Sequence, residues 1–532
     1  MPGSCINLPR ILMRQMSPLA RWSCALGLSL AAGCTSLPAM HGAAPALQAA
    51  HPSLPETRLS PTEALQWLDR VGWGATGQDL VELQHLGLKS WLAWQLAPAP
   101  DALPPAVEQQ IASLSISRQP MPALLQELDA RRLAVKNAVS PEDKTRLQQA
   151  LQRRLNQLGT EAQQRFVLRA LYSRAQLQEK MSWFWLNHFS ISMRKADLRA
   201  WAGDYEEQAI RPHALGNFRD LLGATLRHPA MLRYLDNASN AVGRINENHA
   251  RELLELHTMG VGSGYTQADV QAMARILTGA GINLQPAGTP PPRLQPKRQA
   301  DYLRSGFFEF NPARHDYGPK RFLGRPMQAH GMAEIEEALD RIVASPATAR
   351  LIAYKLAVFL VADEPPPALV ERTALAFRTS HADIAATVAA LLTAPEAAHF
   401  GQKYRDPLHY VLACTRLVAN GRIAADAMPV LNWVRRLGQA PYAHETPEGY
   451  PLRQSDWAGP GQMAARFEVA RQIATRSTLL FRADPKALLS EQDWLGQRLD
   501  QWSPASQAAL AQARDPVDWS ALLLSTPEMM YR

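Results

Sequence analysis

Cysteine is scarce in this chain of 532 residues, which holds only four. Cys5 and Cys24 lie in an N-terminal stretch that we expect to be removed, and Cys34 stands at the end of that stretch. Cys414 is isolated in the apolar sequence VLACTRLVA, where a lone cysteine is typical of core packing. We therefore expect a mature chain without disulfides, stabilised by packing alone.

A strong charge of one sign is also lacking. The formal net charge is +8, and the first 33 residues contribute three arginines and no acid, which leaves a mild +5 for the rest. There is no dense run of lysine and arginine and no nucleic-acid-binding motif. The sequence therefore gives no support to a nucleic-acid partner.

The familiar catalytic signatures are missing as well. The sequence contains no nucleophile elbow, no phosphate-binding loop and no zinc signature. Its most polar helical stretch reads HARELLELH, with histidines eight residues apart. On an α-helix this spacing does not place both on one face as the zinc motif HExxH does.

The N-terminus has the features of an export signal. The stretch LARWSCALGLSLAAGC is a basic flank, a short apolar run and then small residues, too short to span a bilayer. Its ending resembles a bacterial lipobox, so we expect residues 1–33 to be a lipoprotein signal peptide and Cys34 to carry lipid. An ordinary cleaved signal with an incidental cysteine is the alternative, and the true start is Met1 or Met16.

The lipid would make the membrane a partner of the chain. Thr35, rather than aspartate, follows the cysteine, and by resemblance to known sorting this indicates the outer membrane, facing the periplasm or the exterior. Residues 34–58 are rich in alanine and proline without periodicity, which suits a flexible tether. We expect the helical body to occupy residues 59–532.

Helical patterns dominate this body. The first begins at Ser60, a predicted N-cap followed by a proline and by Glu63 three residues later. We expect further helices over 78–96, about 106–158, 161–189, 203–212, 215–236, 246–259, 267–278, 331–344, 346–361, 367–377, 381–394, 406–419 and 461–476. Strand-like alternation occurs only around 306–324, a short hairpin or irregular loop. The proline-rich segment 284–297 cannot be helical and reads as a surface excursion. The prediction is a mainly α protein with one large body.

The helix predicted over 246–259 carries most of the candidate chemistry. On a helical wheel Glu247, Arg251 and Glu255 share one arc with Asn248 and Glu252, and apolar residues fill the rest. Because the apolar arc exceeds half of the wheel, we expect a mostly buried helix whose charged strip faces a cleft or an internal network. The alternative is an exposed face with ordinary i,i+4 ion pairs. Gly260 should end the helix, and Thr266 with Asp269 should cap the next one.

Two other segments place ionisable residues in apolar surroundings. The stretch EKMSWFWLNHFSIS (179–192) has aromatic residues all round the wheel and carries Asn187 and His188. Each could equally be a hydrogen-bonded core residue. In the loop, His315 and Asp316 could form a simple turn. We expect all three segments to meet at one central polar site, because buried ionisable groups need partners. The candidate site residues are Asn187, His188, Glu247, Arg251, Glu252, Glu255, His257, His315 and Asp316.

These pieces together resemble a bacterial family catalogued as domain of unknown function 1800. The matching segments include WLDRVGWGATGQDL, EKMSWFWLNHF, NENHARELLELHTMGVGSGYTQADVQAMARILTG, FEFNPARHDYGPKRFLG and LGQAPYAHETPEGYP, in order along nearly the whole chain. The chain departs from the family pattern at Leu186, where the family usually has histidine, at His249, usually tyrosine, and at Ser345, usually histidine. The loss of histidine at Leu186 weakens any proposal that a histidine pair binds metal here.

The resemblance implies an exported helical protein, often encoded beside proteins that resemble sulfatases and alkaline phosphatases. We therefore expect a hydrolase acting on an envelope or extracellular polymer, in which buried glutamates serve as acid and base and Arg251 holds an anionic group. The alternative is a non-catalytic scaffold or chaperone for such an exported sulfatase- or phosphatase-like partner. Storage or transport of a metal is a third possibility, and the sequence leaves cofactor and metal unknown.

Overall fold

The computed structural model describes residues 59–99, 103–401, 403–475, 480–481, 489–500 and 502–532. The structure is 63% helical and only 4% strand, which confirms the predicted mainly α fold. The expected signal peptide (1–33), the tether (34–58) and Cys34 lie outside the described residues.

Capping residues and glycine in the sequence account for the ends of the first helices. They are α1 (Pro61–Val71), α2 (Gly77–Leu86), α3 (Leu88–Leu96), α4 (Pro105–Ser113) and α5 (Ser115–Arg118). The side chain of Ser60 accepts from the backbone of Glu63, and Glu63 accepts from the backbone of Ser60, which confirms the predicted cap. The single helix predicted over 78–96 is two helices, because Gly87 adopts a φ of +74° that glycine tolerates best.

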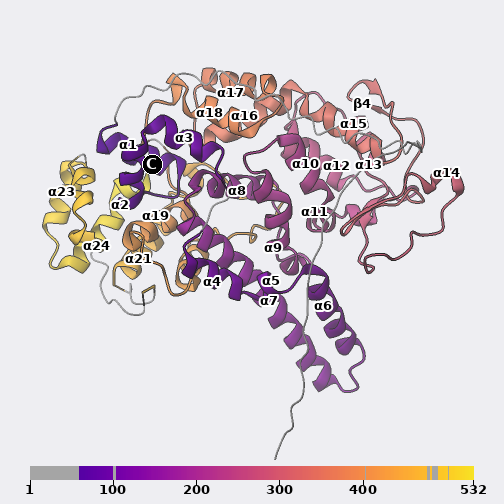
Figure 1. Cartoon of the computed structure of the whole chain (residues 1–532), viewed down its shortest axis with the longest axis horizontal. Helices are drawn as coiled ribbons and strands as arrows, with labels where there is room; N and C mark the ends of the chain where they lie inside the picture. The colour runs from indigo at the N-terminus through magenta and orange to yellow at the C-terminus, as the bar shows by residue number, and fades with distance from the viewer. Residues whose placement is uncertain (1–58, 100–102, 402, 476–479, 482–488, 501) are drawn as a thin grey trace, which may run out of the picture. The chain divides into compact units, whose positions relative to one another are not determined.

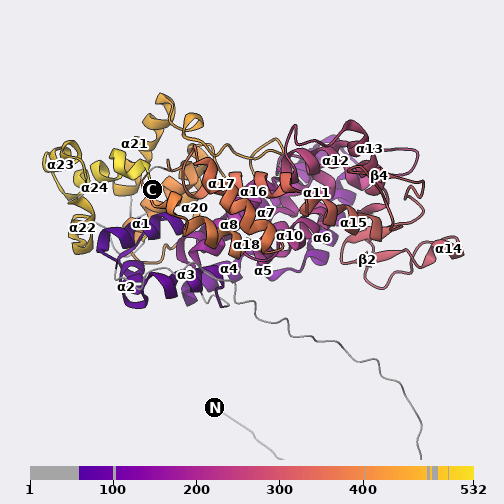
Figure 2. The ribbon, with the colours of Figure 1, turned by 90° about the horizontal axis from the view of Figure 1, so that it is seen from above.

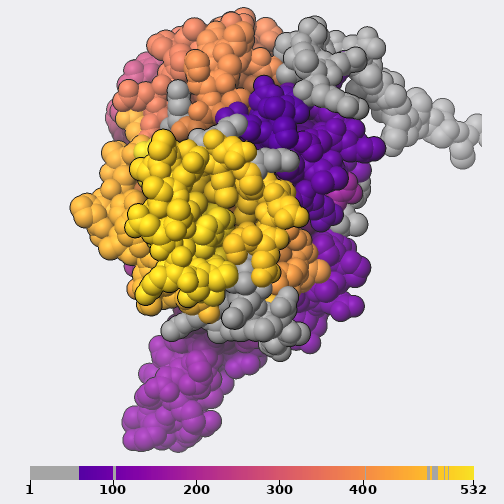
Figure 3. Space-filling model, turned by 90° about the vertical axis from the view of Figure 1, so that its left-hand side faces the viewer, coloured from indigo at the N-terminus to yellow at the C-terminus, as the bar shows by residue number. Residues whose placement is uncertain are grey.

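The next three helices lead to the buried aromatic segment. They are α6 (Met121–Lys136), α7 (Pro141–Tyr172) and α8 (Gln176–His188). Helix α6 packs along the first part of α7, and the pair projects from the rest of the described body (Figures 1 and 3). The sequence pattern suggested a break near residue 160, but α7 runs through it and ends at Tyr172. Helix α8 is buried from Gln176 to His188 except at Gln178, as its aromatic residues predict.

Two stretches of π-helix interrupt the middle of the chain. Its elements are α9 (Ala202–Tyr205), η2 (π-helix, Glu206–Ile210), α10 (Phe218–Arg227), α11 (Pro229–Tyr234), α12 (Asn248–Glu252), η5 (π-helix, Leu253–Thr258) and α13 (Gln267–Ile276). The polar helix predicted over 246–259 is α12 continued by η5, and it ends at Gly260 as expected. Thr266 and Asp269 form the predicted cap of α13. Short π-helical turns are rare and are found frequently at functional sites.

A small sheet follows α13. Its elements are β1 (Ala280–Ile282), α14 (Pro296–Gln299), β2 (Leu303–Ser305), β3 (Phe308–Phe310), β4 (Arg321–Phe322) and β5 (Arg325–Pro326). The antiparallel order is β1-β3-β2, with Phe308 opposite both Ile282 and Ser305, and β4 pairs with β5. The hairpin expected within 306–324 is therefore present but starts earlier, at Leu303. The segment 284–297 is non-helical until Pro296, where the single turn α14 begins.

The last part of the body is again helical. It comprises α15 (Met332–Val343), α16 (Pro346–Leu360), α17 (Pro367–Thr379), α18 (Ile384–Leu392), α19 (Pro407–Ala419), α20 (Met428–Arg436), α21 (Pro460–Thr475), α22 (Gly496–Leu499), α23 (Pro504–Ala511) and α24 (Pro516–Ser525). Helices α16, α17 and α18 lie side by side (Figures 1 and 2), and α21 packs on α24. The C-terminal helices lie next to the first helices of the body (Figure 3). Helices α20, α23 and α24 lie outside the predicted helical ranges.

One continuous apolar core joins these helices. It includes residues from α1 to the C-terminal end, and Cys414 is a buried free thiol within it, as its apolar surroundings predict. Among the described residues no single helix is long and apolar enough to cross a membrane. Helices α15 and α16 reach the length and hydropathy of a membrane span only when they are counted together, and the angle between them is 64°.

Candidate functional site

His188, the last residue of α8, is buried and makes two polar contacts. Its Nε2 lies 2.9 Å from the carbonyl oxygen of His257, and its Nδ1 lies 3.1 Å from Nζ of Lys355. Because a carbonyl oxygen only accepts and an amine donates, His188 carries its proton on Nε2 and accepts at Nδ1. Burial, and then the charge of Lys355, holds the pKa of His188 well below its usual range. The ring is therefore neutral at neutral pH.

Lys355 reaches this histidine from α16. Its Nζ also donates to the carbonyl oxygen of Leu256 at 3.3 Å, and no carboxylate of the described residues forms an ion pair with it. Burial lowers its pKa to about 8. Lys355 is not among the predicted site residues, although a lone lysine in the apolar run LIAYKLAVFL was a usable signal. At slightly alkaline pH much of the amine is unprotonated and can act as a base or a nucleophile.

Two further histidines line the inner side of the polar helix. His249 on α12 and His257 on η5 are both buried, and their Nδ1 and Nε2 atoms, respectively, have no partner among the described residues. Burial lowers the pKa of His249 to about 4 and that of His257 well below its usual range, with His249 contributing to the latter. The rings of His257 and His188 are 6.0 Å apart. The structure thus brings His188 and His257 together, both in neutral form.

The outer side of the same helix carries the predicted ion pairs. Arg251 lies 3.1 Å from Glu247 and 3.4 Å from Glu255, and it also donates to Gln267 of α13. The side chains of Arg251, Glu247 and Glu255 are 39%, 33% and 24% exposed. This strip therefore faces solvent in part.

We expect this exposure to keep the energetic role of Arg251 small. An exposed ion pair contributes under about 1 kcal/mol, whereas breaking a buried one costs about 3–5 kcal/mol. Thermal unfolding of Arg251→Ala should therefore differ little from that of the wild type, and Arg350→Ala, at a surface pair with Glu371, provides the reference. A melting temperature far below that of Arg350→Ala would mean that the three charges act as a buried unit.

Glu252, the last residue of α12, has two acidic neighbours. Burial raises its pKa, and Glu255 and Glu448 raise it further. Glu448 and Glu252 also contribute, after burial, to raising the pKa of Tyr234. Glu252 therefore holds its proton more readily than an ordinary glutamate, which suits an acid.

A loop from the C-terminal part of the chain closes over the end of α8. Asn187 donates to the carbonyl oxygen of Tyr450 at 2.9 Å and accepts from the backbone N–H of Tyr450 at 2.7 Å. Gly449, with a φ of +74°, packs directly on Asn187. This contact brings Glu448 to the polar helix. Glu448 is not among the predicted site residues, and no local pattern around it indicated this contact.

His315 and Asp316 lie in a different polar cluster. His315 Nδ1 contacts Thr278, and its Nε2 lies 3.2 Å from Glu334, which also pairs with Lys320 at 2.7 Å. Asp316 pairs with Arg275 of α13. Lys320 and the ring of His315 are fully buried. No hydrogen bond or ion pair of the described residues joins this cluster to His188 or to the polar helix.

Another buried charge cluster links α1, α8 and the end of the chain. Asp69 lies 2.7 Å from Arg405 and 2.5 Å from Arg498. Lys180 of α8 donates to three backbone carbonyl groups of residues 69–72, and Arg532 donates to Arg70 and Phe359. These groups are paired inside the core, so the cluster has a structural character.

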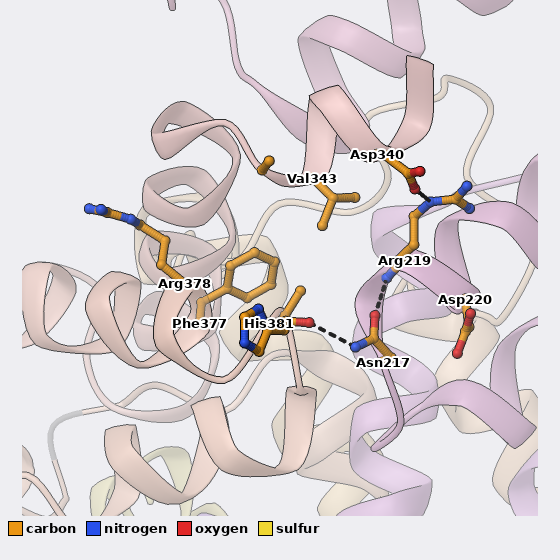
Figure 4. A pocket seen from close by; sticks show the side chains of 10 residues that line it. Asn217, Arg219, Asp220, Asp340, Val343, Phe377, Arg378 and His381 are labelled. Carbon is orange, nitrogen blue, oxygen red and sulfur yellow. Dashed lines mark hydrogen bonds and ion pairs between the residues drawn. The ribbon is translucent and has the colours of Figure 1, made fainter. Parts of the chain in front are cut away.

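A cavity of about 660 Å³ lies where α10, α15 and α17 meet (Figure 4). Phe377 and His381 stand on one side, and Arg219 with Asp340 on the other (Figure 4). Arg219 pairs with Asp340 at 2.6 Å and with Glu336 at 2.7 Å, so its charge is already balanced. None of the predicted site residues lines this cavity.

Within the described residues, no group of three histidine, cysteine, aspartate or glutamate side chains is arranged to hold a metal ion. The model of a family described as "Protein of unknown function (DUF1800)" matches residues 66–531. The chain belongs to this family. No curated protein and no solved structure matches it. DUF1800 membership confirms the resemblance in the sequence but assigns no reaction, so the chemistry must be argued from the residues of this chain.

Proposed function

We propose that this DUF1800 protein is an exported, lipid-anchored envelope hydrolase that acts on an envelope or extracellular polymer, with Lys355 and His188 at the centre of its site. The observation that carries the proposal is the Lys355 amine. It is partly buried, it has no carboxylate partner among the described residues, its pKa is about 8, and it donates to a neutral histidine. Such an amine is poised for proton transfer near neutral pH.

In the proposed hydrolysis, Lys355, His188 and Glu252 have separate roles. Unprotonated Lys355 takes a proton from a water molecule as its oxygen attacks the polymer, and His188 orients the amine. Glu252, with its raised pKa, gives a proton to the leaving group. The sum is the addition of one water molecule across the broken bond. The π-helical turn η5 supplies the Leu256 and His257 carbonyl groups that hold Lys355 and His188 in place.

Export and anchoring rest on the N-terminal sequence. The lipobox-like ending at Cys34 supports lipidation, and the tether of 34–58 would let the body work at a distance from the membrane. We propose the outer membrane as the location. An exported sulfatase- or phosphatase-like protein is the partner that the family resemblance suggests.

A non-catalytic scaffold is the second candidate. The paired, buried clusters around Glu334 and Asp69 favour it, because such networks can fix the register of helices without any reaction. On this view the contact between Lys355 and His188 is one more structural bond.

The reactivity of Lys355 tests whether its amine is available as a base near neutral pH, which the hydrolase requires. We expect its labelling by an acylating reagent, followed by mass spectrometry between pH 6 and 11, to rise with a midpoint near pH 8. The pKa of an ordinary lysine is about 10.4. The amine reacts only when unprotonated, so labelling increases as pH rises through the lowered pKa. The exposed Lys89 and Lys144 provide internal references in the same digest.

Catalysis needs its own measurement. In a screen of envelope polysaccharides and of phosphate and sulfate esters, we expect Lys355→Met to lose about 100-fold or more in turnover. Lys89→Met should retain full turnover, since Lys89 is exposed and no hydrogen bond or ion pair of the described residues joins it to Lys355 or His188. A Lys355 midpoint near pH 10, or full turnover in Lys355→Met, would contradict the proposed hydrolase and favour the scaffold.

A further inference from the structure

A cavity of about 530 Å³ between α7, α20 and the segment 192–199 differs in the charge of its lining from four other cavities of the described residues. Its lining contains three arginines and no aspartate or glutamate. The linings of those four cavities each include at least two carboxylate side chains. The residues that line it are Asn156, Gly159, Thr160, Gln163, Met193, Arg194, Arg199, Arg435, Ala440 and Ala443.

Two of the three arginines are held by neutral partners only. Arg199 donates to Asn156 at 2.6 Å and to Gln152 at 2.8 Å. Its buried Nε–H has no acceptor among the described residues. The nearest acid in sequence, Asp197, is already bound to Arg132 and Arg233.

Arg435 is positioned in a similar way from α20. It donates to Thr160 at 3.2 Å and to Gln163 at 2.5 Å. Gln163 is 2% exposed, and its amide nitrogen donates to the carbonyl oxygen of Pro441 at 2.7 Å, so its oxygen is fixed toward the arginine. Arg194, at the rim, is instead paired with Glu445.

Neither guanidinium group therefore has a carboxylate partner among the described residues, and Arg199 is half-buried while Arg435 is exposed to solvent. Burial lowers the pKa of Arg199, partly offset by Asp197, and burial also lowers the pKa of Arg435. An anion bound between them would relieve this cost and would accept charge-assisted hydrogen bonds from the free N–H groups. Neutral side chains position the two arginines by hydrogen bonds, and the positive charge of each guanidinium group therefore stays available to an anionic ligand.

We propose that this cavity, which we call the arginine pocket, binds a phosphate or sulfate group carried as an ester on a sugar-sized molecule. Planar guanidinium groups match tetrahedral oxyanions through paired hydrogen bonds. The cavity volume lies in the range of small-molecule sites and exceeds that of a single inorganic ion. Met193, Ala440 and Ala443 offer an apolar wall for the rest of the ligand. This proposal does not depend on Lys355.

Calorimetric titration with a hexose monophosphate, a hexose monosulfate, inorganic phosphate and the neutral hexose, all at one ionic strength, tests the pocket. We expect saturable binding of an ester and none of the neutral sugar. Arg199→Gln and Arg435→Gln should each weaken it by about tenfold or more, because each removes charge-assisted hydrogen bonds. Arg435→Lys, which keeps the charge but not the planar fork, should fall between Arg435→Gln and the wild type.

The neighbouring Arg436 provides a matched control. Like Arg435 it is exposed and lies on the same helix, but it does not line the pocket. Arg436→Gln should bind the ester within about twofold of the wild type, and thermal melting checks that each variant is folded. Equal weakening by Arg436→Gln and Arg435→Gln, or no ester binding by the folded wild type, overturns the proposal. Tighter binding of inorganic phosphate than of either ester would also overturn it, because the ligand would then be the free ion.

Discussion

Replacing Asp69 by asparagine should lower the free energy of unfolding by about 3–5 kcal/mol. Oδ2 of Asp69 lies 2.7 Å from the fully buried Arg405 and 2.5 Å from Arg498, and Oδ1 accepts from the backbone of Ala75 at 3.2 Å. Asparagine keeps the shape and can keep the bond to Ala75. It removes the negative charge that pairs with both arginines. Thermal unfolding followed by circular dichroism measures the loss.

A surface acid and the pH dependence serve as controls. Glu371→Gln breaks a pair with Arg350 in which both side chains are 62% exposed, and it should cost under about 1 kcal/mol. Burial alone would raise the pKa of Asp69, but Arg498 and Arg405 outweigh it and lower the pKa from its ordinary 3.8. The stability that Asp69 contributes is therefore present above pH 3.8 and is lost as pH falls through the lowered pKa. The difference in the free energy of unfolding between the wild type and Asp69→Asn should therefore become smaller only in strong acid. Equal losses in Asp69→Asn and Glu371→Gln would contradict a buried role for Asp69.

Local features of the helices could be predicted from the sequence. The caps at Ser60 and Thr266 depend on residues three positions apart, and the structure has both. The burial of α8 follows from aromatic residues on every side of it. Gly260 ends the polar helix as expected. These features depend on neighbours within one or two turns, which a sequence displays directly.

Contacts between distant segments could not be predicted in the same way. Lys355 meets His188 across 167 residues, and Tyr450 meets Asn187 across 263. Neither pairing leaves a local pattern. His315 carried the same local signal as His188, an ionisable residue in apolar surroundings, yet its partners are Thr278 and Glu334. Burial predicts that such a residue has partners, but it does not predict which ones.

The π-helical turn also escaped prediction, and it matters for the site. A wheel drawn at α-helical spacing treats residues 246–259 as one regular helix. In the structure the helix changes at Leu253, and the segment that follows directs the carbonyl groups of Leu256 and His257 at Lys355 and His188. The charged outer side and the histidine-bearing inner side therefore have separate roles. The charged outer side is partly exposed to solvent. The histidine-bearing inner side belongs to the proposed site.

Replacing Gly449 by alanine should cost about 3 kcal/mol or more and should free the loop that holds Glu448 at the polar helix. A methyl group at this position would overlap the carbonyl oxygen of Asn187 and lie 2.8 Å from its Oδ1. The backbone φ of +74° is itself unfavourable for alanine by about 1 kcal/mol. To relieve the overlap the loop must move, which breaks the two hydrogen bonds between Asn187 and Tyr450.

Two other glycines separate the causes of this loss. Gly438 has a φ of +85° with open space around its missing side chain, and Gly459 has open space and no positive φ. Gly459→Ala should be neutral, Gly438→Ala should cost only the backbone strain, and Gly449→Ala should cost clearly more than both in thermal unfolding. Hydrogen exchange should show faster exchange across residues 444–451 in Gly449→Ala alone, since the overlap with Asn187 forces the loop away from α8. If Gly449→Ala melts like Gly438→Ala and its loop stays protected, the loop is not held by Asn187, and Glu448 has no fixed place beside Glu252.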